Sequence, residues 1–294
     1  MNLFPVNMFE NRKPWLNLGC GSRFREEWIN IDMMERPPHV LGYDLRKGIP
    51  LSSDSCDIVY HSSFIEHLRV PEALDLMIEC FRVLKLGGIV RVATPDLERI
   101  CRLYLEKLDS ACKEERSVPD YDWIMLELYD QEVRESSGGR MLEYLKQDSL
   151  PNEKFILERI GIEGVDILRS IRDARNDRQE QRSGQVGDNA GSFVMSLKQK
   201  LKWRILEFLI GHEGLKAKEI GEFRLGGEVH HWMYDRFSLK KLFVRAGFSN
   251  IVLQTAATSN IRNWQETCLD SLPDGAVLKP DSLFMEGVKN NNNE

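Results

Sequence analysis

The sequence of 294 residues is long enough for one large domain, or for one domain with a substantial insertion, and for a sizeable buried core. Its composition of 42% hydrophobic and 29% charged residues, with a mean hydropathy of -0.38, is that of an ordinary soluble protein. The net charge of -6 argues against a nucleic-acid partner, because proteins that bind phosphate backbones normally present clustered positive charge.

The cysteines and the amino terminus indicate the compartment. The six cysteines include no Cys-x-x-Cys pair, so neither a zinc site nor a redox dithiol is indicated. Residues 1–13 lack the continuous apolar core of a secretory signal, and no apolar run approaches the length of a membrane span. We therefore expect a reduced, cytoplasmic protein that does not associate with membranes.

The first motif is a short apolar run, 15–18, followed at once by Gly19 and Gly21. Glycine adopts positive φ and carries no Cβ, so backbone at such a turn can approach a ligand closely. We interpret the stretch as a strand that ends in a nucleotide-binding loop. Alone, this pair of glycines is a weak signal, because a plain tight turn from strand to helix has the same composition.

Two further apolar runs, 28–31 and 39–43, end in Asp32 and Asp44. A carboxylate at the end of the second strand can accept two hydrogen bonds from a ribose diol. The spacing argues against a dinucleotide fold, because Phe24 stands where its third glycine would be and the acid follows after only about a dozen residues. The helix between the first two strands must then be a stub. An NAD-dependent sugar enzyme is disfavoured on the same ground.

The next elements continue this alternation as far as Pro95, a pattern typical of a parallel sheet covered by helices. Apolar residues at helical spacing over 71–84 predict an amphipathic crossover helix, which Gly87 and Gly88 would end. Residues 89–94 then form the predicted fifth strand.

The pattern changes to helices from about Leu97 to about Leu225. We interpret this part as an inserted helical lid between the fifth strand and the last crossover helix. Its most linker-like stretch is 183–192, which we expect to be mobile. The predicted helices are 97–108, 121–135, 140–146, 153–160, 165–182 and 193–210.

The sheet resumes near the carboxyl terminus. Ser238 is placed to cap a helix that runs to Ala246 and closes at Gly247. Residues 248–253 and 282–288 are the last two predicted strands.

In this order the motifs resemble the class I S-adenosylmethionine-dependent methyltransferases, of the methyltransferase type 11 kind. Asp32 stands where the ribose-binding acid of this family stands, and Asp44 with Leu45 stands where its adenine-contacting acid stands. Leu86 occupies a position where the family usually has proline, which affects the rigidity of that turn. The other matching segments are 16–21 for the first motif, 57–68 for the fourth strand and 81–88 for the turn before the fifth strand.

The resemblance implies an α/β fold with a Rossmann-like seven-stranded methyltransferase sheet whose last strand is antiparallel. The core would consist of residues 1–96 and 226–294, with the helical insertion at 97–225. The segments 227–235 and 279–286 are also similar to bacterial relatives associated with saccharide and secondary-metabolite clusters.

The implied cofactor is S-adenosylmethionine, with S-adenosylhomocysteine as the product. Asp32 would fix the ribose, Asp44 the adenine amino group, and the backbone of the glycine loop the methionine portion. The full set of expected cofactor residues is Asn17, Leu18, Gly19, Cys20, Gly21, Asp32, Met33, Asp44, Leu45, Ser62, Ser63, Phe64 and His67.

The need for a catalytic base depends on the acceptor. Methyl transfer requires mainly that donor and acceptor are held close and collinear, but a hydroxyl acceptor must also lose its proton. The candidate bases are His67, His230, His231 and Asp96. His67 could instead be a structural histidine beside the cofactor, and Asp96 could simply cap the following helix.

The segment 226–235 concentrates polar and aromatic groups and is the best candidate for the acceptor site. His230 and His231 with Glu228 could suggest a metal, but neighbouring residues on an extended chain point to opposite faces. We therefore expect no metal.

The sequence thus predicts a methyltransferase that acts on a small-molecule acceptor, at an oxygen of a sugar or of a glycosylated intermediate. The alternative is a non-catalytic protein that keeps the cofactor pocket and uses the insertion to bind a partner or to oligomerise. The amphipathic run 193–210 motivates this alternative, although core packing is the commoner explanation for such a stripe.

Overall fold

The computed structural model describes residues 12–183 and 197–291 of the chain. The predicted linker lies outside these residues from Gly184 onward, as does the start of the helix predicted at 193–210. No helix in the described ranges is both long and apolar enough to cross a membrane.

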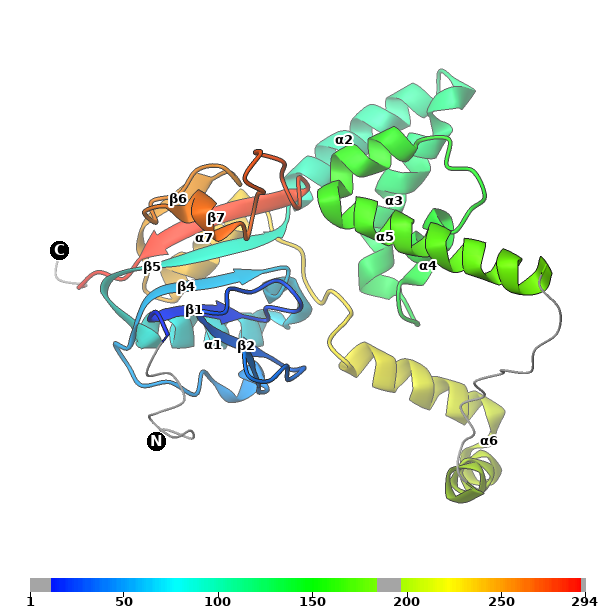
Figure 1. Cartoon of the computed structure of the whole chain (residues 1–294), viewed down its shortest axis with the longest axis horizontal. Coiled ribbons are helices and arrows are strands. Elements are labelled where there is room, and N and C mark those ends of the chain that lie inside the picture. Colours follow the sequence, from blue (N-terminus) through cyan, green and yellow to red (C-terminus); the bar gives the residue numbers. More distant parts are fainter. Residues whose placement is uncertain (1–11, 184–196, 292–294) are drawn as a thin grey trace.

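Seven strands of the described residues form one sheet in the order β3-β2-β1-β4-β5-β7-β6 (Figure 1). Strand β7 runs antiparallel to β5 and β6, whereas the pairs from β3 to β5 are parallel. The predicted Rossmann-like methyltransferase sheet is therefore confirmed. The strands are β1 Trp15–Leu18, β2 Ile29–Asp32, β3 Val40–Gly42, β4 Cys56–Ser62, β5 Leu84–Pro95, β6 Ser249–Gln254 and β7 Ser282–Val288.

Helices α1 (Val70–Val83) and α7 (Arg236–Arg245) cover one face of the sheet and enclose the largest apolar core. Helix α1 begins where Glu72 accepts a hydrogen bond from the Arg69 N–H (2.9 Å), so its first turn is capped. The predicted cap of α7 was wrong: Asp235 is the N-cap, and Ser238 is the third helical residue, which completes the capping box. Gly87 and Gly88 lie inside β5, not before it.

The other face of the sheet is covered by the irregular segment 255–281. Trp28, Tyr60 and Trp264 form an apolar cluster there. Arg91 on β5 lies beside this cluster, fully buried, and forms ion pairs with Asp270 and Glu286 (both 2.7 Å). Side chains alternate along a strand, so Val90 and Val92, which flank Arg91, face the opposite side of the sheet, which the helices cover.

Residues 19–28 form turns and no helix, so the connection from β1 to β2 is shorter than even the predicted stub. The remaining short elements are 3₁₀ turns. They lie at Leu45–Lys47, Ile65–His67, Glu115–Ser117 and Trp264–Thr267.

Three of the helices between β5 and α7, those at 118–133, 139–145 and 153–183, pack around their own apolar cluster, which includes the buried Trp123. Trp123 donates a hydrogen bond to Glu127 (2.6 Å), which in turn pairs with Arg159 (2.5 Å). Figure 1 shows α2 to α5 beyond the end of β5, and α6 set apart from them. The helices are α2 Leu97–Ala111, α3 Val118–Val133, α4 Gly139–Leu145, α5 Glu153–Ser183 and α6 Leu197–Leu225.

Helix α5 is broken at Gly161, whose backbone has φ 61° and ψ -143°. A Cβ at this position would lie 2.7 Å from the Leu278 carbonyl oxygen and would also collide with Pro280. Glycine therefore allows the helical segment to touch the chain just before β7, and this contact fixes the insertion against the sheet.

Candidate functional site

The glycine loop lies at the end of β1. Gly19 has φ 59°, and a Cβ on it would lie 2.5 Å from the ring of Phe64, so only glycine fits here. Gly21, with φ 53°, faces open space. Both glycines thus hold positive φ values that glycine adopts readily, and at Gly21 no side chain stands between the main chain and the open space.

Asp32 lies at the end of β2, directly beside this loop. Its two carboxylate oxygens accept hydrogen bonds from the backbone N–H groups of Gly21 and Met34 (both 2.8 Å). These bonds fix the side chain at the edge of the sheet, and the residue is only partly buried.

Asp44 lies at the end of β3 and caps the 3₁₀ turn Leu45–Lys47. Arg46 forms an ion pair with it (2.9 Å) and lowers the pKa of the Asp44 carboxyl through this side-chain hydrogen bond. The carboxylate therefore stays charged, and it shares its lone pairs with Arg46.

A first cavity of about 220 Å³, which we call the strand-tip cavity, lies against both carboxylates. It reaches from the glycine loop to the start of the segment that follows α6. Its lining residues include Gly19, Asp32, Met33, Asp44, Leu45, Ser63, Phe64, His67 and Gly227.

A second cavity of about 210 Å³, the loop cavity, lies on the other side of Gly19. Lys279 enters it and contacts Ser63 Oγ (2.6 Å) and Glu163 (3.4 Å), and Glu163 also lies 3.6 Å from Arg23. The loop cavity thus contains charges of both signs, the pattern that an amino-acid zwitterion requires. The expected residues Asn17, Cys20, Gly21 and Ser62 also line it.

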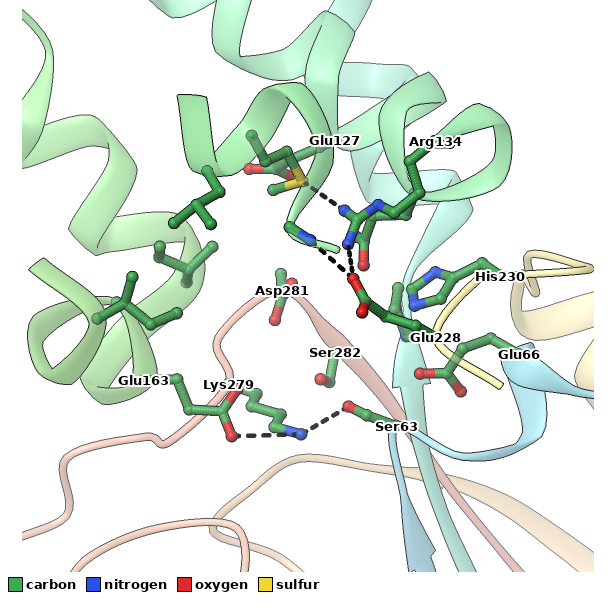
Figure 2. Close-up of a pocket in the computed structure, with 18 of the residues that line it drawn as sticks. Ser63, Glu66, Glu127, Arg134, Glu163, Glu228, His230, Lys279, Asp281 and Ser282 are labelled. Carbon is green, nitrogen blue, oxygen red and sulfur yellow. Dashed lines mark hydrogen bonds and ion pairs between the residues drawn. The ribbon is translucent and has the colours of Figure 1, made fainter. Parts of the chain in front are cut away.

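A third and larger cavity, of about 410 Å³, lies between the sheet edge and the helical insertion (Figure 2). Its far wall consists of apolar side chains of the insertion, such as Trp123, Leu145 and Ile160, and its near end is polar. Ser63 lines all three cavities. Its backbone has φ 47°, an uncommon conformation for serine that recurs at ligand sites.

Charged groups crowd the polar end of the large cavity. Glu228 accepts hydrogen bonds from Arg134 (3.1 Å) and from the Gly138 N–H (2.8 Å), and Arg134 also pairs with Asp130 (3.0 Å). Burial, followed by the charge of Glu127, raises the pKa of Asp281 from its ordinary value of 3.8 to about 7.

Three groups converge where the large cavity meets the strand-tip cavity. His67 lines both cavities, and its ring centroid lies 4.6 Å from that of His230. The fully buried Glu66 accepts a hydrogen bond from Thr94 (3.0 Å) through one oxygen. Its other oxygen is buried and has no hydrogen-bond partner among the described residues.

The other two candidate bases lie elsewhere. Asp96 caps helix α2 by accepting a hydrogen bond from the Arg99 N–H (3.2 Å), and burial raises the pKa of Asp96. His231 is anchored through its backbone N–H to the Glu66 carbonyl (2.7 Å). Neither residue lines any of the three cavities. The expected cofactor residue Leu18 has its side chain in the core.

Sequence reasoning missed Arg23, Glu163 and Lys279 in the loop cavity, and Glu66 in the large one. The first three come from three distant parts of the chain, and no local pattern marks them. Glu66 directly precedes His67, so a pair of metal-ligating residue types was visible at that point.

In a comparison with protein families, residues 30–92 match the model of a methyltransferase domain. These residues run from β2 into β5 and include the ends of β2, β3 and β4 that line the strand-tip cavity. The match identifies this part of the chain as methyltransferase-like. No protein of the curated set shows significant similarity to the chain.

Several solved structures are similar in outline. An S-adenosylmethionine-dependent methyltransferase from Archaeoglobus fulgidus aligns at 21% identity over 34% of this chain and 54% of that one, with a TM-score of 0.26. The chain thus spans about half the length of that protein. One from Thermotoga maritima aligns at 15% identity over 98% of this chain and 84% of that one (TM-score 0.34). A structure of a complex that contains the Haloferax volcanii Trm112 methyltransferase activator aligns at 10% identity over 97% of this chain and 88% of that one (TM-score 0.33). Because all three TM-scores are below 0.5, we base no inference on them.

Proposed function

We propose that this chain is a class I S-adenosylmethionine-dependent methyltransferase that methylates a hydroxyl oxygen of a sugar or of a glycosylated intermediate. One observation carries the proposal: the strand-tip, loop and large cavities meet at Ser63. Two small cavities joined across a glycine suit the two halves of the cofactor, and the large one suits an acceptor.

The residues present fit the cofactor. The strand-tip cavity would hold the adenosine, with Asp32 at the ribose and Asp44 at the adenine. The loop cavity would hold the methionine portion, with Lys279 opposite its carboxylate and Glu163 opposite its ammonium group. The open space beside Gly21 would let the ligand come close to the loop, because no side chain stands there. When bound, S-adenosylmethionine supplies an electrophilic methyl group.

The large cavity supports an acceptor with one polar and one apolar end. Arg134, Glu228 and Asp281 can hydrogen-bond to the hydroxyl groups of a sugar, and the apolar wall of the insertion can contact an aglycone. His67 and His230 lie at the end of this cavity nearest the strand-tip cavity, where an acceptor hydroxyl must lose its proton. We leave His231 and Asp96 out of the proposed site.

The proposal is tested by calorimetry with S-adenosylhomocysteine. Wild-type protein is expected to bind one molecule, and Asp32→Ala to bind about 10- to 100-fold more weakly, because charge-assisted hydrogen bonds contribute about 1.5–3 kcal/mol each. Asp75→Ala, on the exposed face of α1, is the matched control and should bind as wild type. Absence of binding to the wild type at millimolar ligand contradicts the proposal.

Turnover is measured as S-adenosylhomocysteine release with a panel of glycosylated acceptors and their aglycones. We expect product only with acceptors that carry free sugar hydroxyls. Methylation of the aglycones alone would contradict the sugar assignment and leave the methyltransferase assignment in place.

The second candidate function is a cofactor-binding protein of the same fold that recruits a partner or oligomerises. Helix α6 favours it, because Phe208 is 89% exposed and Leu209 is 69% exposed on a segment set apart from the rest (Figure 1). A protein that stays strictly monomeric in size-exclusion chromatography and turns over acceptor would exclude this candidate.

A further inference from the structure

We propose that Glu66, His67 and His230 form a binding site for a divalent transition-metal ion such as Zn²⁺, at the junction of the large cavity and the strand-tip cavity. Two imidazoles and one carboxylate are a ligand set that holds catalytic zinc. The sequence argued against a different set of metal ligands, which consisted of Glu228, His230 and His231. Figure 2 shows Glu66 and His230 at the same end of the cavity.

The spacing of the three groups supports the site. One ligand atom from each residue lies within 4.8 Å of the others. Ligands around a tetrahedral ion with bonds of about 2.1 Å lie roughly 3.4 Å apart. Binding therefore requires the most widely separated of these atoms to approach each other by up to about 1.4 Å, and the partly exposed His67 has the most room to rotate.

The carboxylate of Glu66 is the strongest single indication. The residue is 0% exposed, and one of its oxygens has no partner in the described part of the chain. A buried carboxylate oxygen without a hydrogen bond is costly, so it calls for a cation or a donor at that point. Its second oxygen is oriented by Thr94, as the carboxylate ligands of metal sites commonly are.

Both histidines are arranged as ligands. His67 Nδ1 lies 3.3 Å from the Val229 carbonyl oxygen, so Nδ1–H can donate to it and leave the Nε2 lone pair free. The backbone of His230 is fixed to α3 by a hydrogen bond to the Gln131 carbonyl (3.0 Å). The side chain of His230 is buried (6% exposed), and one of its ring nitrogens lies within 4.8 Å of a ligand atom of Glu66 and of His67.

The surroundings can balance the charge of the ion. Besides the ligand Glu66, the lining of the large cavity includes four carboxylate residues and two cationic ones, Arg134 and Lys279, which pair with Glu228 and Glu163. Three protein ligands leave a coordination position that faces the cavity, as in catalytic rather than structural zinc sites.

The role of the ion rests on the proposed function. An acceptor hydroxyl bound at the open position would have its pKa lowered. Its O–H bond would then break with the electron pair left on oxygen, and the proton would leave through the cavity to solvent. His67 and His230 would thus promote loss of the proton as ligands and not as bases.

The test uses Co²⁺, which replaces zinc and absorbs visible light according to its coordination. Wild-type protein without cofactor is titrated with Co²⁺, and the bound metal is counted after desalting. We expect one ion per chain, with a visible spectrum that Zn²⁺ abolishes by competition. Glu66→Gln and His230→Ala should each weaken binding more than about 100-fold, and Thr94→Val about 10-fold. His212→Ala, which removes an exposed histidine, is the matched control and should bind as wild type.

Two outcomes overturn the proposal. Wild-type protein that takes up no stoichiometric Co²⁺ would show that Glu66 is satisfied by a water molecule or a proton instead. Retention of the spectrum by both Glu66→Gln and His230→Ala would place the ion elsewhere. Calorimetry with S-adenosylhomocysteine, run on the same variants without metal, reports their folding. It also separates failure of the metal site from failure of the proposed function.

Discussion

Replacing Arg91 by leucine should be among the most destabilising single substitutions in the core. Arg91 is 0% exposed, pairs with Asp270 and Glu286, and donates to the Thr255 (2.8 Å) and Thr258 (3.0 Å) carbonyls. Its guanidinium also lies between the rings of Trp264 (4.9 Å) and Phe284 (5.3 Å). One side chain thus ties the segment 255–281 to the middle of the sheet.

The magnitude follows from what the substitution leaves behind. Two buried carboxylates lose their counter-ion, and removing one partner of a buried ion pair costs about 3–5 kcal/mol. Both carboxylates keep neutral donors: Asp270 has the Tyr60 hydroxyl (2.7 Å), and Glu286 has the Asn260 N–H (2.8 Å). We therefore expect the free energy of unfolding to fall by about 3 kcal/mol, the lower end of that range.

The assay is urea unfolding followed by tryptophan fluorescence, because Trp264 and Trp28 lie in the same cluster. The unfolding midpoint should fall while the slope stays constant. Arg102→Leu, which removes an exposed helical pair with Glu98, is the control and should change the free energy of unfolding by less than about 0.5 kcal/mol. The triple variant Arg91→Leu, Asp270→Asn, Glu286→Gln should recover part of the loss. A change below about 1 kcal/mol in Arg91→Leu would refute the reasoning.

Three further predictions concern the glycine loop, the attachment of the insertion and the large cavity. Gly19→Ala should weaken S-adenosylhomocysteine binding more than about 10-fold in calorimetry, because the new Cβ would displace the Phe64 ring. Binding as tight as that of the wild type would contradict the close contact between Gly19 and Phe64. Gly161→Ala should loosen the insertion from the sheet, because its Cβ would collide with Pro280 and the Leu278 carbonyl. The expected readout is faster proteolysis within α5 while the sheet stays folded. An unchanged cleavage pattern would argue against the contact between α5 and the chain before β7. The raised pKa of Asp281 means that the folded state binds more protons than the unfolded state between about pH 4 and 7, so the free energy of unfolding of the wild type falls as the pH rises through that window. From pH 5 to pH 7.5, the free energy of unfolding of Asp281→Asn, measured with urea, should therefore rise relative to that of the wild type by at least about 1 kcal/mol. Parallel pH profiles of the two proteins would exclude the pKa shift.

The sheet could be predicted because its signals are local. Each strand is a short apolar run, and Asp32 and Asp44 directly follow such runs, so their meeting at one edge follows from parallel pairing. Local signals also mislead: Asp235 and Ser238 are both good caps, and only the backbone shows which of them begins α7.

What escaped prediction depends on distant contacts. Segment 255–281 has no periodicity, so nothing marked it as the cover of a sheet face or as the partner of Arg91. His67 and the Val229 carbonyl are 162 positions apart, and only the return of the chain from the insertion brings them together. Lys279 and Glu163 meet because Gly161 lets α5 approach β7, a consequence of packing that no spacing rule contains.

The point where the chain leaves the sheet for the helical insertion lies against the point where it returns to the sheet, at Tyr234. Asp96 and Tyr234 form a parallel bridge, and the Leu97 N–H donates to the Tyr234 carbonyl (2.9 Å) where the chain leaves the sheet. The insertion thus leaves and rejoins the sheet at one point, and the contact of Gly161 with the chain before β7 attaches it a second time. A change in the helices between these points can therefore alter the wall of the large cavity while every strand of the sheet keeps its neighbours.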